Sequence, residues 1–292
     1  MMYLPQRLVI ERAVGDSPLV KRILATSPGI PVDWVERVQE YADGENGSFL
    51  EIVKFRGRFI KPCPGTRFYN CCGYQILNLG IQCSLGCTYC ILQAYFASPN
   101  VRLFANLDDA IQQLTEHLNN SPNQIHRIGT GEFTDSLLLD PLIHLSENLV
   151  PFFAAQPRAI LELKTKTAQV DLLEKMDHRG HTIVAWSLNP PEVIAKEEAG
   201  AATLEERLGA AKRCQGWGYR VAFHFDPLLA YPGWQQGYQE VVDRLFSAVD
   251  PGGIAWISLG TLRFMPSLKT VIQQRYPNTS ILYEEFVPGL DG

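Results

Sequence analysis

The chain has 292 residues, of which 46% are hydrophobic and 20% are charged, and its formal net charge is −5. This composition is ordinary for a globular protein, and the acidic balance disfavours non-specific binding to duplex DNA, which needs a basic surface. No apolar run reaches about 18 residues and no signal peptide is evident, so we expect no membrane association and a cytoplasmic protein.

The first 73 residues are predicted to form a small α/β extension with a cysteine-rich end. Alternating apolar residues favour a strand, and apolar residues at helical spacing favour a helix. Proline suits the first turn of a helix. On these grounds we expect a strand over Gln6–Glu11, helices over Ser17–Ala25 and Pro31–Tyr41, and a strand over Glu51–Ile60.

From residue 74 to residue 292, strand and helix patterns alternate. Near-continuous apolar strands separated by amphipathic helices are typical of a parallel sheet covered by helices. Six such units predict an α/β fold, a partial (β/α)6 TIM-like barrel, whose site lies at the carboxyl ends of the strands. The expected strands are 74–82, 125–131, 159–166, 181–189, 219–227 and 254–260, and the expected helices are 106–118, 138–149, 170–176, 204–218 and 238–249.

Three of the seven cysteines stand in one short CxxxCxxC segment, as Cys83, Cys87 and Cys90. Thiolates are soft ligands that suit zinc or iron–sulfur clusters, and structural zinc needs four ligands. A [4Fe–4S] cluster is usually held by four thiolates, so three on one loop would leave one iron open to a substrate or cofactor. Structural zinc and unliganded thiols are the alternatives.

This segment, placed directly after the first barrel strand, resembles the radical S-adenosylmethionine superfamily. Tyr89 matches the aromatic residue before the third cysteine, and GTGE at 129–132 is similar to the family's GGE-type turn. The resemblance implies a [4Fe–4S] cluster whose open iron binds S-adenosylmethionine, which is cleaved to a 5′-deoxyadenosyl radical. It also implies that Gly131 and Glu132 lie near the methionine amino group and that Tyr89 packs beside the adenine.

Over roughly residues 74–275 the chain also resembles the spore photoproduct lyase family. The shared segments are CTYCILQ, FTDSLLLD, TKTAQVDLLEK, SLNPPEVI, LEERLGAAKR, YPGWQQGY and LRFMP. The resemblance implies that Thr134, Asp135 and Ser187 contact S-adenosylmethionine and that Lys166 reaches its carboxylate. A zwitterionic methionyl group needs partners of both charges, which suits this set. Alternatively, Thr134 caps a helix and Lys166 is a solvated cation.

Two departures concern the chemistry that defines the lyase. The family's hydrogen-donating cysteine falls on Glu132, and a tyrosine implicated in radical relay falls on Ile91, although Tyr89 remains. Because a carboxylate has no weak X–H bond to give, we expect a family relative with an unidentified substrate. Three upstream thiols are candidates for a replacement donor, an auxiliary cluster or ordinary buried cysteines: Cys63, Cys71 and Cys72.

Further residues carry weaker signals. Cys214 is expected in the core, and His224 with Asp226 could form an acid–base pair or simply be satisfied by hydrogen bonds. Aromatic residues and arginine on the substrate side could stack on a base or anchor loops; these are Tyr231, Trp234 and Arg263.

Together these observations predict a radical S-adenosylmethionine enzyme with Tyr89, Cys71 and Cys72 as candidate catalytic residues. It would need a reductant such as flavodoxin or ferredoxin, and a nucleic-acid substrate stays open. One alternative is a genuine DNA photoproduct lyase with Cys71 or Cys72 as hydrogen donor. The other is a non-catalytic iron–sulfur electron carrier.

Overall fold

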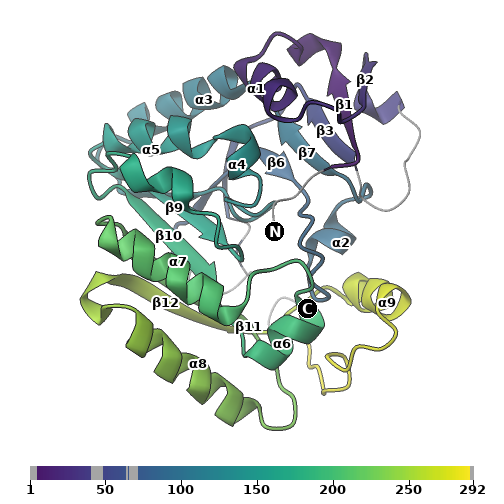
Figure 1. Cartoon of the computed structure of the whole chain (residues 1–292), viewed down its shortest axis with the longest axis vertical. Helices are drawn as coiled ribbons and strands as arrows, with labels where there is room; N and C mark the ends of the chain where they lie inside the picture. The colour runs from purple at the N-terminus through teal and green to yellow at the C-terminus, as the bar shows by residue number, and fades with distance from the viewer. Residues whose placement is uncertain (1–4, 41–48, 64, 66–71, 290–292) are drawn as a thin grey trace.

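The computed structural model describes residues 5–40, 49–63, 65 and 72–289. The larger of its two sheets has six parallel strands and one antiparallel strand (Figure 1). The order of the strands is β12-β11-β10-β9-β8-β5-β4, with β4 antiparallel to β5. Within the described residues, β12 and β4 are not paired with each other, in agreement with the predicted partial (β/α)6 fold. The strands are β4 (Ile60–Pro62), β5 (Gln75–Leu77), β8 (His126–Gly129), β9 (Ala159–Thr165), β10 (Thr182–Ser187), β11 (Arg220–Leu228) and β12 (Ile254–Thr261).

Helices cover the outer face of this sheet (Figure 1). Helix α7 (Leu204–Gly216) packs on β10 and β11, and it starts at a capping box in which Thr203 and Glu206 satisfy each other's backbone N–H groups. Cys214 on this helix is fully buried in the core, as predicted. None of the helices built from described residues is both long and apolar enough to cross a membrane. The others along the barrel are α3 (Leu107–Asn119), α4 (Asp140–Ile143), α5 (Ser146–Ala154), η4 (Asp171–Lys175), α6 (Pro191–Glu197), α8 (Trp234–Ala248), η5 (Pro251–Gly253) and α9 (Pro266–Arg275).

The smaller sheet has the order β2-β1-β3-β7-β6 and carries helix α1 (Pro18–Thr26), which Ser17 caps. The helix predicted from Pro31 to Tyr41 is wrong over its described part, because β2 and a short 3-10 helix, η2 (Val38–Glu40), stand there instead. Two valines favour an extended backbone, and β2 finds a parallel partner in β1, so sheet pairing overrides the helical pattern. The strands are β1 (Arg7–Glu11), β2 (Val32–Val35), β3 (Phe49–Val53), β6 (Gly80–Ile81) and β7 (Val101–Phe104), with η1 (Arg12–Val14) after β1.

The two sheets exchange strands along the chain. The single strand predicted over residues 51–60 is two strands, β3 in the smaller sheet and β4 in the larger one. Similarly, the strand predicted over residues 74–82 divides into β5 and β6, which belong to different sheets. The proposed domain boundary at residue 73 therefore stays a prediction, since hydrogen-bonded strands from both sides of it share each sheet.

Candidate active site

A cavity of about 290 Å³ opens at the carboxyl ends of the barrel strands. Its walls come from the cysteine segment, the turn after β8, the ends of β9 and β10, and residues 226–227 of β11. Every described residue that the sequence assigned to the cluster or the cofactor lines this one cavity. They are Cys83, Cys87, Tyr89, Cys90, Gly131, Glu132, Thr134, Asp135, Lys166 and Ser187.

The cysteine segment is held in place by the connection that follows α6. Gly200 N donates to the Leu85 carbonyl at 2.8 Å, and Thr88 N donates to the Glu197 carbonyl at 2.9 Å. A Cβ on Gly200 would stand 2.8 Å from the Leu85 carbonyl oxygen, so this close approach requires glycine. The loop that presents the thiols is therefore fixed by backbone contacts with residues 197–200.

The three thiols differ from a mononuclear metal site. Burial raises the pKa of Cys87 to about 12 and raises the pKa values of Cys83 and Cys90, so thiolates there call for a nearby cation. Among the described residues, no three Cys, His, Asp or Glu side chains converge closely enough to hold a single ion. Three soft donors that line one cavity without meeting at one point fit a polynuclear cluster better than zinc, whose ligands all lie about 2.3 Å from one centre.

A buried charge network that sequence reasoning missed lies directly beneath these thiols. Glu198 Oε1 accepts hydrogen bonds from Lys166 Nζ at 2.8 Å, from Asn189 Nδ2 at 2.9 Å and from the Tyr89 hydroxyl. Its other oxygen pairs with the Arg207 guanidinium. Lys166, expected to reach a cofactor carboxylate, thus lines the cavity while its ammonium group also contacts Tyr89 Oη at 2.9 Å.

The charges of this network decide its protonation. Burial alone would raise the pKa of Glu198, but the positive charges of Lys166 and Arg207 outweigh it and hold that pKa well below its usual range. Burial and the neighbouring Glu198 raise the pKa of Tyr89, which stays a neutral phenol. Tyr89 is consequently fixed as a hydrogen-bond donor at the base of the cysteine segment.

Asp135 organises the turn after β8 from within. Its Oδ1 accepts from Leu137 N at 3.0 Å, Leu138 N at 2.9 Å and Thr165 Oγ1 at 2.7 Å, and its Oδ2 accepts from Lys166 N at 2.8 Å. Burial raises the pKa of this carboxyl group, although the four hydrogen bonds oppose that rise. Asp135 therefore joins the turn to the end of β9, besides lining the cavity.

Gly131 lets the same turn approach β9 closely. A Cβ there would lie 2.8 Å from Lys164 Cβ and 2.9 Å from the Lys164 carbonyl oxygen. Ser136 Oγ completes this contact by accepting from Lys164 N at 3.1 Å and from Thr130 Oγ1 at 2.8 Å.

At the position where the resemblance places a donor cysteine, Glu132 forms an ion pair with Lys164. Burial alone would lower the pKa of Lys164, but the charges of Glu132, Glu162 and Asp226 outweigh it and raise that pKa. The position is therefore occupied by a charged pair, which lines the cavity and cannot donate a hydrogen atom.

His224 and Asp226, predicted as a possible acid–base pair, have different hydrogen-bond and ion-pair partners. His224 Nε2 lies 2.8 Å from Glu162 Oε1, and His224 Nδ1 lies 2.6 Å from Ser258 Oγ. Asp226 instead pairs with Arg263 at 3.2 Å, and both of these residues line the cavity, whereas His224 does not. His224 is therefore an interior residue whose two ring nitrogens are both satisfied by hydrogen bonds.

The remaining candidates divide between the cavity and other places. Ile91 lines the cavity, whereas Tyr231 and Trp234 do not. Cys63 is half-buried and Cys72 is exposed, both close to the start of β5, while Cys71 lies outside the described residues.

Comparison with known proteins agrees with this geometry. A family model described as spore photoproduct lyase matches residues 71–286. The spore photoproduct lyase of Geobacillus sp. (strain Y412MC61) is 31% identical over 212 residues, which are 72% of this chain and 62% of that protein. The protein of the same name from Bacillus subtilis (strain 168) is 28% identical over 206 residues, which are 70% of this chain and 60% of that one. The chain thus matches somewhat less than two thirds of the length of these two relatives.

Solved structures of spore photoproduct lyase share the fold. A double variant of that enzyme, with AdoMet and dinucleoside spore photoproduct bound, superimposes with a TM-score of 0.86 at 26% identity. The match covers 96% of this chain and 85% of that one. In that variant one cysteine is changed to alanine and one serine to cysteine. A complex with the dinucleoside photoproduct superimposes with the same score.

Proposed function

Because the chain belongs to the spore photoproduct lyase family, we propose that it is a radical S-adenosylmethionine enzyme that repairs a thymine dinucleotide photoproduct of DNA. One observation carries this proposal: the three cysteines and all the described residues expected to hold the cofactor line the same cavity. Relatives that superimpose on 96% of the chain bind AdoMet and the dinucleoside photoproduct, which supports both ligands here.

Cys83, Cys87 and Cys90 would hold a [4Fe–4S] cluster that leaves one iron open. When bound, this cluster supplies the electron that cleaves S-adenosylmethionine to a 5′-deoxyadenosyl radical. Lys166 offers the cationic partner, and Glu132 the anionic partner, that a methionyl carboxylate and ammonium group require. Tyr89 fixes the base of the cavity, and Thr134, Asp135 and Ser187 complete its wall.

The hydrogen donor must differ from that of the family, because Glu132 is ion-paired and has no weak X–H bond. We infer a thiol of the upstream segment, Cys72 or Cys71, whose S–H would pass its hydrogen atom to the product radical and leave a thiyl radical. Reduction of the cluster calls for a one-electron donor, for which a flavodoxin or ferredoxin in the cytoplasm is our prediction.

The Glu132–Lys164 pair also favours a second candidate function, in which the same radical chemistry acts on another substrate. Anaerobic reconstitution with iron and sulfide, then reduction with dithionite and S-adenosylmethionine, separates the possibilities. Release of 5′-deoxyadenosine that disappears in Cys87→Ala establishes the radical enzyme. Conversion of dinucleoside spore photoproduct to two thymidines, with lower yield in Cys72→Ala or Cys71→Ala, establishes the lyase.

Two results would go against the proposal. Release of 5′-deoxyadenosine without any thymidine product would indicate that the enzyme acts on another substrate. A stable cluster whose electron paramagnetic resonance signal does not change when S-adenosylmethionine is added, with no 5′-deoxyadenosine released, would indicate an electron carrier.

A further inference from the structure

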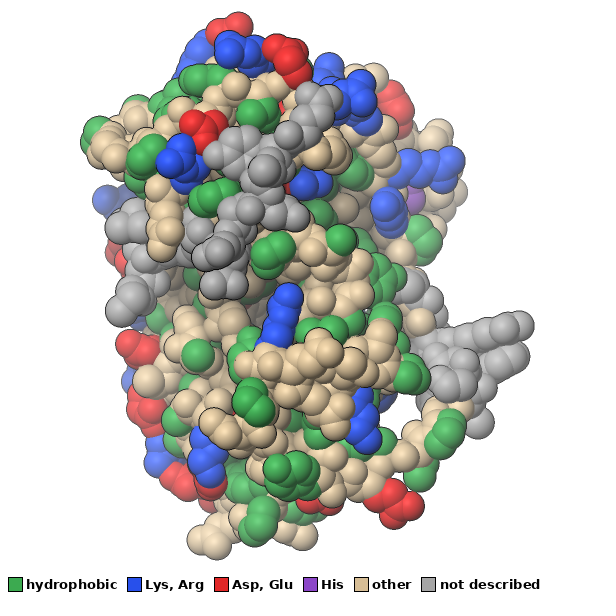
Figure 2. Space-filling view, turned by 90° about the vertical axis from the view of Figure 1, so that its right-hand side faces the viewer, with side chains coloured by type: hydrophobic (Ala, Val, Ile, Leu, Met, Phe, Trp, Pro, Cys, Tyr) green, Lys and Arg blue, Asp and Glu red, His purple; other side chains and the backbone are tan. Residues whose placement is uncertain are grey.

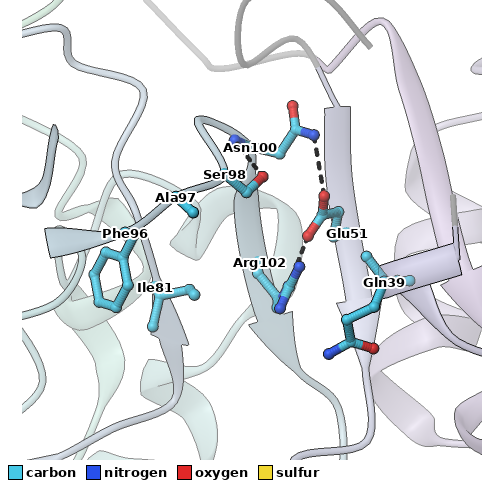
Figure 3. Close-up of a pocket in the computed structure, with 9 residues that line it drawn as sticks. Gln39, Glu51, Ile81, Phe96, Ala97, Ser98, Asn100 and Arg102 are labelled. Atoms are coloured by element: carbon cyan, nitrogen blue, oxygen red, sulfur yellow. Dashed lines mark hydrogen bonds and ion pairs between the residues drawn. The ribbon is translucent and has the colours of Figure 1, made fainter. Parts of the chain in front are cut away.

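A second cavity, of about 390 Å³, lies beside the cysteine segment and plays no part in the site described above. It is formed where β3 and β7 of the smaller sheet meet residues 96–100, which follow helix α2 (Leu92–Tyr95). We call it the flanking pocket. Figure 3 shows its lining, with Phe96 and Ile81 on one side and Arg102, Glu51 and Gln39 toward the other.

One wall of the flanking pocket is polar and rigid. Arg102 Nε donates to Glu51 Oε2 at 2.6 Å, and Asn100 Nδ2 donates to Glu51 Oε1 at 3.0 Å. The Glu51 side chain is only 7% exposed and that of Arg102 is 19% exposed, so both are held on the sheet. The two charges cancel, which favours a neutral, hydrogen-bonding ligand over a free phosphate.

The opposite wall is apolar and partly aromatic, made by Ile81, Phe96 and Ala97. A pocket with one flat apolar wall and one wall of donors and acceptors matches a planar heterocycle with a polar edge. Aromatic rings stack on every base, while guanidinium donates to base acceptors and carboxylate accepts from base amino groups.

Aromatic side chains connect the flanking pocket to the active-site cavity. The ring of Phe133 lies 6.0 Å from that of Phe96 and 6.3 Å from that of Tyr95. Phe133 stands between Glu132 and Thr134, which line the active-site cavity, whereas Phe96 lines the flanking pocket. Tyr95 is 52% exposed, and Figure 2 shows that the middle of the face carrying α2 and α9 has few acidic side chains to repel a nucleic-acid strand.

We propose that the flanking pocket binds a nucleobase next to the lesion in a single DNA strand, with Tyr95, Phe96 and Phe133 as the stacking surface between the two cavities. This inference rests on the proposed function, because it takes the lesion in the active-site cavity as its starting point. It extends that function from a dinucleotide to a strand, whose neighbouring base stacks on Phe96 and meets the Glu51–Arg102 wall.

The test compares two ligands and two variants. Ala97→Trp fills the flanking pocket from an exposed position that does not line the active-site cavity. Ala13→Trp, at an exposed position of η1, is the matched control. Affinity is measured by fluorescence anisotropy for a photoproduct-containing single strand with several flanking nucleotides, and by competition for the dinucleoside photoproduct.

We expect Ala97→Trp to weaken strand binding roughly 5- to 100-fold, the loss of one base–aromatic stack, and to leave dinucleoside binding unchanged. Tyr95→Ala should weaken only strand binding as well, and Ala13→Trp should change neither. Equal effects of Ala97→Trp on both ligands, or on neither, would overturn the inference.

Two further measurements complete the test. One distinguishes a base of the DNA strand from a free nucleotide, and the other distinguishes failure of the base site from failure of the proposed lyase function. If a free nucleoside monophosphate binds the wild type but not Ala97→Trp, while strand affinity stays the same, the flanking pocket takes a free nucleotide and the inferred strand site is overturned. Because these are binding measurements, a strand effect without any turnover of the dinucleoside retains the pocket and removes the proposed lyase function.

Discussion

Glu198 and Arg207 form an ion pair in which neither side chain has any exposed surface. Arg207 also donates to the Ala202 and Ser187 carbonyls at 2.8 Å each. Its guanidinium group therefore joins the α6–α7 connection to the end of β10. Removal of one member of a buried pair leaves an uncompensated charge in the interior, which typically costs about 3–5 kcal/mol.

We therefore expect Glu198→Gln to lower the free energy of unfolding by about 3–5 kcal/mol, measured by urea denaturation. The matched control is Glu192→Gln, which removes an exposed partner of Lys196 and should change the unfolding free energy little. A similar small effect at both positions would show that the Glu198 network does not stabilise the fold.

Glu162 predicts a pH dependence of stability. Burial alone would raise its pKa, but the hydrogen bond and charge of His224 and the charge of Arg127 outweigh burial and lower it. A carboxyl group with a depressed folded pKa stabilises fully above its unfolded pKa of about 4.3, and this contribution is lost as the pH falls toward the folded pKa. The difference in unfolding free energy between wild type and Glu162→Gln should shrink as the pH falls below about pH 4. A difference that grows on acidification contradicts the assignment.

Tyr74 offers a test of a buried hydroxyl. Its phenol oxygen is inaccessible and has no hydrogen-bond partner among the residues that the structure describes. Tyr74→Phe removes a polar group that is costly to bury, and we expect the free energy of unfolding to stay the same or rise by about 1 kcal/mol. The control is Tyr219→Phe, which loses a 2.9 Å bond to the Leu173 carbonyl and should cost about 1 kcal/mol. Loss of stability in Tyr74→Phe comparable to that in Tyr219→Phe would reveal a partner for the Tyr74 hydroxyl.

Gly131 tests the fit of the turn after β8. A Cβ would meet the Lys164 backbone and Cβ within 3 Å, so Gly131→Ala should push the turn away from β9, reduce S-adenosylmethionine binding and lower the melting temperature. Gly209→Ala is the control, since nothing lies within 4 Å of its added carbon in α7, and alanine there should stabilise by about 0.5–1 kcal/mol. Calorimetry of both variants, with ligand titration, checks the pair; unchanged ligand affinity in Gly131→Ala counts against the proposed role of the turn.

The sequence predicted strands β9 to β12 to within about two residues, because each is a long apolar run that ends at a polar or glycine-containing turn. The cavity residues were assigned from the resemblance to the radical S-adenosylmethionine superfamily and the spore photoproduct lyase family. They share one cavity because parallel strands bring their carboxyl ends to one edge. Glu198 and Arg207 were missed because their pairing depends on how α6 and α7 pack, which leaves no spacing signal. Strand β7 and helices α2, α6 and α9 were not predicted either, being short or weakly patterned.

The backbone contacts between residues 197–200 and the cysteine segment affect what happens to the protein when oxygen destroys a bound cluster. These backbone hydrogen bonds and the Gly200 contact are made without any of the thiols. Loss of a cluster to oxidation would then leave the ligand loop folded and its thiols in place. Recovery of such a protein would need fresh iron, sulfide and reductant, and no refolding.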